Sequence, residues 1–400
     1  MLLPLATALL LIGDAQSSPP DRGEAEQLAR AGRTEEAMGL FEQIAAQDPE
    51  DMEARLWVAR LALRLGRTAD ATARFRSVLE KRPNDVDARI GLGIALTRGG
   101  SWQEALILLR EAEPAAGENA DLFSALARAY RRSGDDRRAL EYFTRARALA
   151  PHDPDVVAGY EAVARVYGHA IAFEGFTENG APGAEALSGS LAVDLRVVPA
   201  LHLQASARVQ ERPDATDTIG GGGAVWRFAR TTTAGVRALG GPGNVSLPAL
   251  DVSGELIHYA GNLEVGGGFR SLSFAGAGVL AASPTLSWDP GPQRLDTRYT
   301  YSRSRFDDAG ESTGDHSVMV RDTWRAWRRV SLSGTYAYGI ESFEDLTVDR
   351  IGALGTTTLA GGVQIRLPSL TTLTTTWEHQ WRSNDTMIDR LTLSVVQVLP

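Results

Sequence analysis

The residues 188–212, SGSLAVDLRVVPALHLQASARVQER, alternate between apolar and polar side chains on both sides of a central proline. In an extended chain Leu191 and Leu195 fall on one face, and Asp194 and Arg196 fall on the other. The stretch therefore predicts two strands, each with an apolar and a polar face. A soluble sandwich would bury the apolar face as its core, whereas a membrane barrel would turn that face to lipid.

The same alternation of apolar and polar residues continues from residue 168 to residue 400, with clusters of turn-forming residues between the alternating segments. Clear strand candidates are VSLSGTYAYGIE (330–341), TTTLAGGVQIRL (356–367), LTTTWEHQWR (373–382) and RLTLSVVQVL (390–399). Charged residues occur at strand centres, and aromatic residues gather in the last strands, where barrels place interfacial girdles. These features favour an antiparallel transmembrane β-barrel of about 12–14 strands over a soluble secreted sandwich or solenoid.

The barrel interpretation assigns each face of the strands an environment. The predicted lumen residues are Asp194, Arg196, Arg208, Arg366 and Glu378. The predicted lipid-facing residues are Leu191, Leu195, Leu203, Leu359 and Val363.

The first half of the chain repeats with a period of 34 residues. The repeating columns are Gly32, Gly66, Gly100 and Gly134; Ala37, Ala71, Ala105 and Ala139; and Phe41, Phe75, Leu109 and Phe143. The glycine ends a helix because it adopts a positive φ at little energetic cost. The alanine lets neighbouring helices approach closely, and the Phe or Leu fills the gap between helix pairs. The pattern resembles the tetratricopeptide repeat and predicts an all-α solenoid over residues 18–167, including a capping helix that starts at residue 154.

Arginines form a further column, near the predicted end of the first helix in each pair. Its members are Arg30, Arg64, Arg98 and Arg132, with Arg60 and Arg128 one helical turn earlier. One interpretation is that these cations complement the helix dipole. The other is a basic strip in the repeat groove, formed by Arg60, Arg64, Arg98, Arg128 and Arg132, that binds an acidic periplasmic protein or an anionic polymer.

The N-terminal residues 1–15, MLLPLATALLLIGDA, have the apolar core and small residues of a secretory signal cleaved after Ala15. The net charge of −9 argues against a general nucleic-acid binder. The sequence contains no cysteine, which excludes disulfides, thiolate metal sites and cysteine nucleophiles.

Catalytic motifs are weak. The six histidines form no HExxH pair, and Asp315, His316 and Ser317 lie in a turn-rich stretch without a nucleophile elbow. The GGGG run at 220–223 lacks the Lys-Ser/Thr of a phosphate loop, which favours close strand packing or a turn. We therefore expect a protein that is not an enzyme and holds no cofactor or metal.

The order of signal, tetratricopeptide repeats and C-terminal barrel resembles the YaiO family of outer-membrane β-barrel proteins. The segments YAYGIESFED and VDRIGALGTTTLAGGVQIRL resemble that family's C-terminal strands, whereas the ending VVQVLP lacks the terminal aromatic of the usual assembly signal. The resemblance implies a barrel in the bacterial outer membrane, with outer-membrane lipid and the barrel-assembly machinery as partners, and a periplasmic N-terminal domain. The same order of parts is similar to that of the outer-membrane exporters of cellulose and poly-N-acetylglucosamine.

The sequence thus supports three hypotheses. The first is assistance in the export or assembly of an exopolysaccharide or other envelope polymer. The second is an outer-membrane scaffold with a filled lumen, which paired lumen charges would favour. The third is a barrel enzyme acting on lipid or glycan, which a His/Ser/Asp cluster near the lipid face would favour.

Overall fold

The computed structural model describes residues 21–180, 185–198, 200–229, 231–307, 312–339, 355–383 and 385–399. The predicted signal at 1–15 lies outside these residues. The chain forms two compact units, residues 1–160 and 161–400. We describe each unit by itself.

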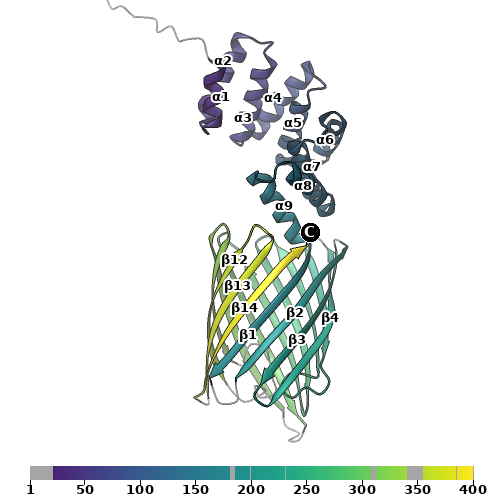
Figure 1. The fold of residues 1–400 in the computed structure, drawn as a ribbon, viewed down its shortest axis with the longest axis vertical. Helices are drawn as coiled ribbons and strands as arrows, with labels where there is room; N and C mark the ends of the chain where they lie inside the picture. Colours follow the sequence, from purple (N-terminus) through teal and green to yellow (C-terminus); the bar gives the residue numbers. More distant parts are fainter. Residues whose placement is uncertain are drawn as a thin grey trace, which may run out of the picture. The chain divides into compact units, whose positions relative to one another are not determined.

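Helices make up the first unit. Their bounds are α1 Arg22–Arg30, α2 Thr34–Gln47, α3 Met52–Arg64, α4 Thr68–Lys81, α5 Val86–Arg98, α6 Trp102–Ala116, α7 Ala120–Ser133, α8 Asp136–Leu149 and α9 Pro154–Tyr167 (Figure 1). The unit boundary falls within α9, so its last two turns belong to the second unit. In the described part of the chain, no helix combines the length and the apolar character needed to cross a membrane.

The helix pairs follow the predicted 34-residue period. The four turn glycines, Gly32, Gly66, Gly100 and Gly134, have φ values between 76° and 93°, as predicted. A second column, Asp51, Asp85, Asn119 and Asp153, begins the odd-numbered helices from α3 onward. Each of these side chains accepts a hydrogen bond of 2.9–3.0 Å from the backbone N–H three residues later, which satisfies a free helix donor.

Two large residues of the repeat, Phe75 and Phe143, are buried against glycines of the following helix. Phe75 is fully buried, and a Cβ added to Gly91 would lie 2.3 Å from its ring. Phe143 has the same relation to Gly159. The ring occupies the space that a side chain would need, so Gly91 and Gly159 allow the close contact in these two repeats.

In the part of the second unit that the structure describes, fourteen strands close into an antiparallel barrel, visible as tilted arrows in Figure 1. Their bounds are β1 His169–Gly180, β2 Ala186–Val198, β3 Leu201–Arg212, β4 Ala215–Ala229, β5 Thr232–Gly240, β6 Leu250–Ala260, β7 Leu263–Phe274, β8 Ala277–Trp288, β9 Gln293–Phe306, β10 Ser312–Trp327, β11 Val330–Gly339, β12 Thr356–Arg366, β13 Thr371–Arg382 and β14 Met387–Leu399. Each strand pairs with its neighbours in sequence, and β1 pairs with β14. The predicted fold class is therefore correct.

The apolar face of the strands points outward. Leu191, Leu195, Leu203, Leu359 and Val363 are 37–48% exposed on the outer surface. The intervening residues are more buried, as the pattern of β3 shows, and face the lumen. Among the described barrel residues, the buried apolar cluster of Leu272, Phe274, Ala277 and Val279 is much smaller than the core that a soluble sandwich needs.

Most exposed aromatic side chains on the outer face lie toward one end of the barrel or the other, whereas Phe173, Phe269, Tyr299 and Trp377 lie near mid-strand. We call the end that carries His169 and Leu399 the terminal end, and the opposite end the loop end. Exposed aromatics near the terminal end are Trp226, Phe228, Trp288, Trp324 and Trp327. Exposed aromatics toward the loop end are Tyr301, Tyr336, Tyr338 and Trp381.

The GGGG run lies inside β4. A Cβ at Gly221 would lie 2.2 Å from the carbonyl oxygen of Ala238, and one at Gly223 would lie 2.4 Å from that of Val236, both on β5. The run therefore permits close strand packing, which was one of the two predicted interpretations.

The ring and glycine contacts predict opposite effects of two alanine substitutions in the isolated fragment 16–167. Gly91→Ala should lower its free energy of unfolding by about 1–3 kcal/mol, because the methyl group collides with Phe75. Gly39→Ala, in the open interior of α2, should raise it by up to about 1 kcal/mol. Urea denaturation followed by circular dichroism measures both. A disordered parent fragment, or stabilisation by Gly91→Ala, would contradict this packing.

Candidate functional site

The lumen wall carries all five predicted lumen residues, but they do not form one cluster. Asp194 accepts a 2.9 Å hydrogen bond from Gln204 and lies 2.9 Å from Nδ1 of His202. Glu378 accepts a hydrogen bond from Gln380. Arg208 lies 4.0 Å from Glu174 across the lumen face. Arg196 is nearly buried, with its guanidinium over the ring of Tyr167.

Arg366 belongs to a basic group where the last two turns of α9 meet the terminal end of the barrel. Arg165 donates to Oγ1 of Thr372 at 3.1 Å and to the carbonyl of Leu367 at 3.2 Å. Burial lowers the pKa of Arg165, Glu161 opposes this effect, and the nearby Arg366 and Arg329 add to it. The opening at this end is therefore positively charged next to the helix.

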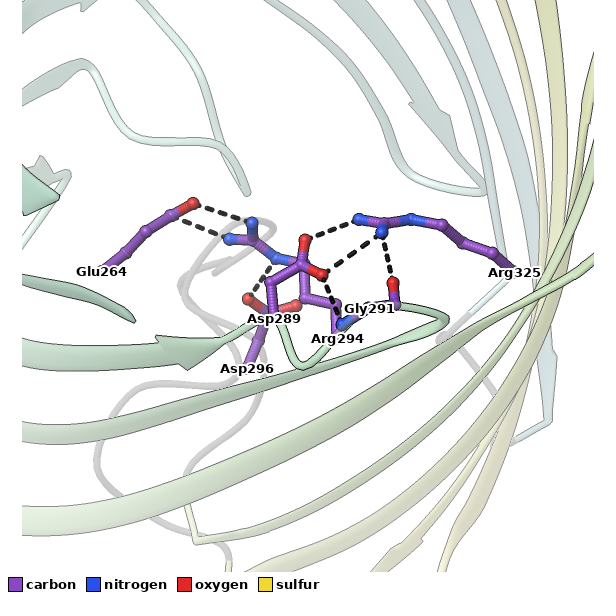
Figure 2. A network of polar contacts seen from close by, with 6 residues as sticks. All are labelled: Glu264, Asp289, Gly291, Arg294, Asp296 and Arg325. Carbon is purple, nitrogen blue, oxygen red and sulfur yellow. Dashed lines mark hydrogen bonds and ion pairs between the residues drawn. The ribbon is translucent and has the colours of Figure 1, made fainter. Parts of the chain in front are cut away.

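Paired charges line the lumen along β6–β10. Arg294 donates to both carboxylate oxygens of Glu264, at 2.8 and 2.9 Å, and to Asp296 at 2.8 Å (Figure 2). Beside this group, Arg325 binds Asp289 and the carbonyl of Gly291 in the β8–β9 turn (Figure 2). The hydrogen bond from Arg325 holds the pKa of Asp289 below its usual value.

A second set of paired charges lies toward the loop end. Asp251, which is almost fully buried, binds Arg270 through two hydrogen bonds of 3.0 and 2.9 Å and lies 3.8 Å from Arg237. Two arginines share one carboxylate in this set, so most of its charge is engaged within the wall.

The pair Glu178 and Arg390 closes the seam between the first and last strands. The two residues are register partners on β1 and β14, are 1% and 5% exposed, and are joined by contacts of 3.1 and 2.8 Å. The guanidinium also lies 4.7 Å from the ring centre of Phe176. Removing one partner of such a pair costs about 3–5 kcal/mol, because the other charge stays buried.

Hydroxyl groups dominate the wall formed by β10–β14. The strand register aligns two rows across this wall: Ser331, Gln364, Thr374 and Ser394; and Ser333, Gly362, Thr376 and Thr392. We call the side chains of Ser331, Ser333, Thr374, Thr376 and Thr392 the hydroxyl wall. They line a cavity of about 380 Å³ in the lumen. A second lumen cavity of about 540 Å³ lies beside the charged residues of β5–β10.

The hydroxyl wall was not predicted from the sequence. Its signal was the alternation TTLTTT at 371–376, in which every second threonine faces the lumen. The sequence predicts a strand at 373–382, but no role was predicted for its threonines.

Asp315, His316 and Ser317 do not form a catalytic triad. Strand alternation places His316 on the outer face, where Nδ1 lies 2.5 Å from the hydroxyl of Tyr299, and places Asp315 and Ser317 on the inner face. His379 also lies outside, 2.8 Å from Asp389 and between Trp377 and Trp381. Within the described ranges, no group of three acidic or histidine side chains is arranged to hold a metal ion.

The repeat arginines mostly contact neighbouring repeats. Arg64 donates to the carbonyl of Ala29 at 2.9 Å, and Arg98 donates to that of Leu63 at 2.8 Å. Each guanidinium thus reaches the last turn of the odd-numbered helix in the preceding repeat, where carbonyls lack helical partners. This contact links helices of neighbouring repeats, which neither sequence interpretation described.

The other members of the column differ in their surroundings. Arg60 lies 2.6 Å from Asp87, Arg128 lies 3.8 Å from Asp155, and Arg30 lies 3.1 Å from Glu26. Arg132 is exposed at the end of α7. The proposed basic strip is therefore partly neutralised by carboxylates.

Comparison with known proteins concerns the first unit. Three sequence models of the tetratricopeptide repeat match residues 28–74, 59–120 and 122–157. The solved structure of TTC0263, a thermophilic TPR protein of Thermus thermophilus, is 26% identical with a TM-score of 0.33, over 35% of this chain and 78% of that chain. MamA 41-end from Desulfovibrio magneticus RS-1 is 24% identical with a TM-score of 0.31, over 36% and 80%.

A search of the curated proteins finds no match. The repeat models cover the helices whose caps, turn glycines and buried rings follow the 34-residue period. The first unit is built from tetratricopeptide repeats.

The arginine contacts between repeats predict a stability effect. In fragment 16–167, Arg64→Gln and Arg98→Gln should each lower the free energy of unfolding by about 1 kcal/mol, since each removes a charged donor from a helix end. Arg132→Gln, which removes an exposed guanidinium, is the matched control and should change it by less than about 0.5 kcal/mol. Urea denaturation measures the free energy of unfolding of each variant. Equal effects at the three positions would contradict the linking role of Arg64 and Arg98.

Proposed function

We propose that this chain is a bacterial outer-membrane barrel with a periplasmic repeat domain, and that its lumen is a passage for an exopolysaccharide or another envelope polymer. The observation that carries the membrane assignment is the outer face of the barrel. Its apolar side chains and two bands of aromatic residues match the surface that outer-membrane barrels present to lipid and to the two interfaces.

The lumen supports the passage. Its wall is polar, and it contains cavities of about 380 and 540 Å³ rather than a packed apolar interior. Tetratricopeptide repeats generally bind proteins, so we assign the first unit the recruitment of a periplasmic partner. The barrel would be delivered to the membrane by the barrel-assembly machinery, and the chain would act without enzymatic chemistry.

A scaffold without transport is the second candidate. The observation that favours it is the paired charge along β6–β10, where Arg294 is held by Glu264 and Asp296. Such pairs rigidify the wall and reduce the charge available to a passing chain.

Two measurements on the full-length protein test the proposal. Envelope fractionation should recover it with the outer membrane, and its gel mobility should change on heating. Purified protein in planar lipid bilayers should then give discrete ion-conductance steps, since a water-filled lumen conducts ions. Recovery in the soluble periplasm would contradict the membrane assignment, and membrane insertion without conductance would favour the scaffold.

A further inference from the structure

The hydroxyl wall has a regular arrangement that the proposed passage does not by itself require. Antiparallel neighbours in a sheet lie about 4.7–4.9 Å apart, so the register sets successive side chains at that spacing across the wall. Ser333, Thr376 and Thr392 therefore form a row across the lumen face, with Gly362 between the first two.

The glycine in this row keeps a space open. A Cβ at Gly362 would lie 2.6 Å from Oγ of Ser333 and 3.1 Å from Oγ1 of Thr376. Any larger residue would crowd the two hydroxyls. The row thus exposes hydroxyl groups on both sides of a small depression.

These hydroxyls are available for hydrogen bonding. Among the described residues, the side-chain oxygens of Ser333, Thr374, Thr376 and Thr392 make no hydrogen bond to the protein, and all four residues are only partly buried. By contrast, the hydroxyl of Thr335, in the next row, already accepts from Arg321 at 3.1 Å. Each free hydroxyl offers one donor and two acceptor positions to a molecule in the lumen.

Charged residues around the same cavity have protein partners. Arg390 is held by Glu178, and Glu378 accepts from Gln380. Glu174 lies 4.0 Å from Arg208. An anionic polymer is best bound by charge-assisted hydrogen bonds from Arg or Lys. Arg390 and Arg208 face carboxylates, and Arg321, which also lines the cavity, donates to the hydroxyl of Thr335.

We propose that the hydroxyl wall is a binding surface for a neutral, polyhydroxylated glycan chain. This inference rests on the proposed passage and names its substrate class. Sugar hydroxyls both donate and accept hydrogen bonds, as the serine and threonine side chains do, so a neutral glycan can exchange partners along the rows. The five side chains of the hydroxyl wall are uncharged, so they favour a neutral glycan over a polyanion.

The test compares two valine substitutions with a control on the same strand. Thr374→Val and Thr376→Val, combined, remove two lumen hydroxyls while keeping side-chain volume and strand preference. Thr375→Val makes the same change on the outer face. Full-length protein in detergent is titrated by calorimetry with maltohexaose, a neutral oligosaccharide, and with hexagalacturonate, an anionic one.

Maltohexaose should bind more tightly than hexagalacturonate. The double variant should weaken its affinity about thirtyfold, since it removes two neutral hydrogen bonds of about 1 kcal/mol each, and Thr375→Val should leave it unchanged. Heat-modifiable gel mobility confirms that each variant is folded. Absence of maltohexaose binding, tighter hexagalacturonate binding, or equal losses in the double variant and the control would each overturn the inference.

The same proteins separate the failure of this inference from failure of the passage. Conductance in bilayers without sugar binding would leave the passage intact and remove the glycan surface. Sugar binding with the predicted variant effects but without conductance would retain the surface and remove the passage.

Discussion

Closure of the barrel is the constraint on which the second unit depends. A strand in lipid must satisfy its backbone donors and acceptors through neighbouring strands, so an open edge is not tolerated. Pairing of β1 with β14 removes the edge, and the buried contact between Glu178 and Arg390 lies on that seam. Once the sheet is closed, strand alternation leaves only two environments, an outer surface and a lumen. The apolar leucines and the polar side chains are distributed between them.

The repeat unit depends on a different constraint, which is close contact between successive helix pairs. A ring such as Phe75 fits only because Gly91 has no side chain. Each repeat also contributes a carboxylate or amide to begin a helix, as Asp85 does for α5. Arg64 and Arg98 reach carbonyl groups of the preceding repeat. A column of arginines can therefore recur for structural reasons, because each repeat presents the same helix end to the next.

Local pattern was sufficient to predict the architecture. Alternation assigned Leu195 to the outside and Arg196 to the lumen, and the 34-residue period located the turn glycines. Partners that are distant in sequence were not predictable, because alternation gives the face of a residue but not its neighbour. Glu178 and Arg390 are 212 residues apart, and the rows of the hydroxyl wall combine four strands. Strand alternation alone also implies that the adjacent residues Asp315 and His316 lie on opposite faces of the sheet.

The central claim is that the apolar face of the strands meets lipid while the polar face lines a water-accessible lumen. Because the chain has no cysteine, single cysteines can be introduced along β3, at positions 203 to 207, and each variant reconstituted in liposomes. A small, water-soluble thiol reagent should modify the variants Gln204→Cys and Ser206→Cys quickly, and those at Leu203, Ala205 and Ala207 slowly. Uniform labelling, or labelling with the opposite alternation, would contradict the account.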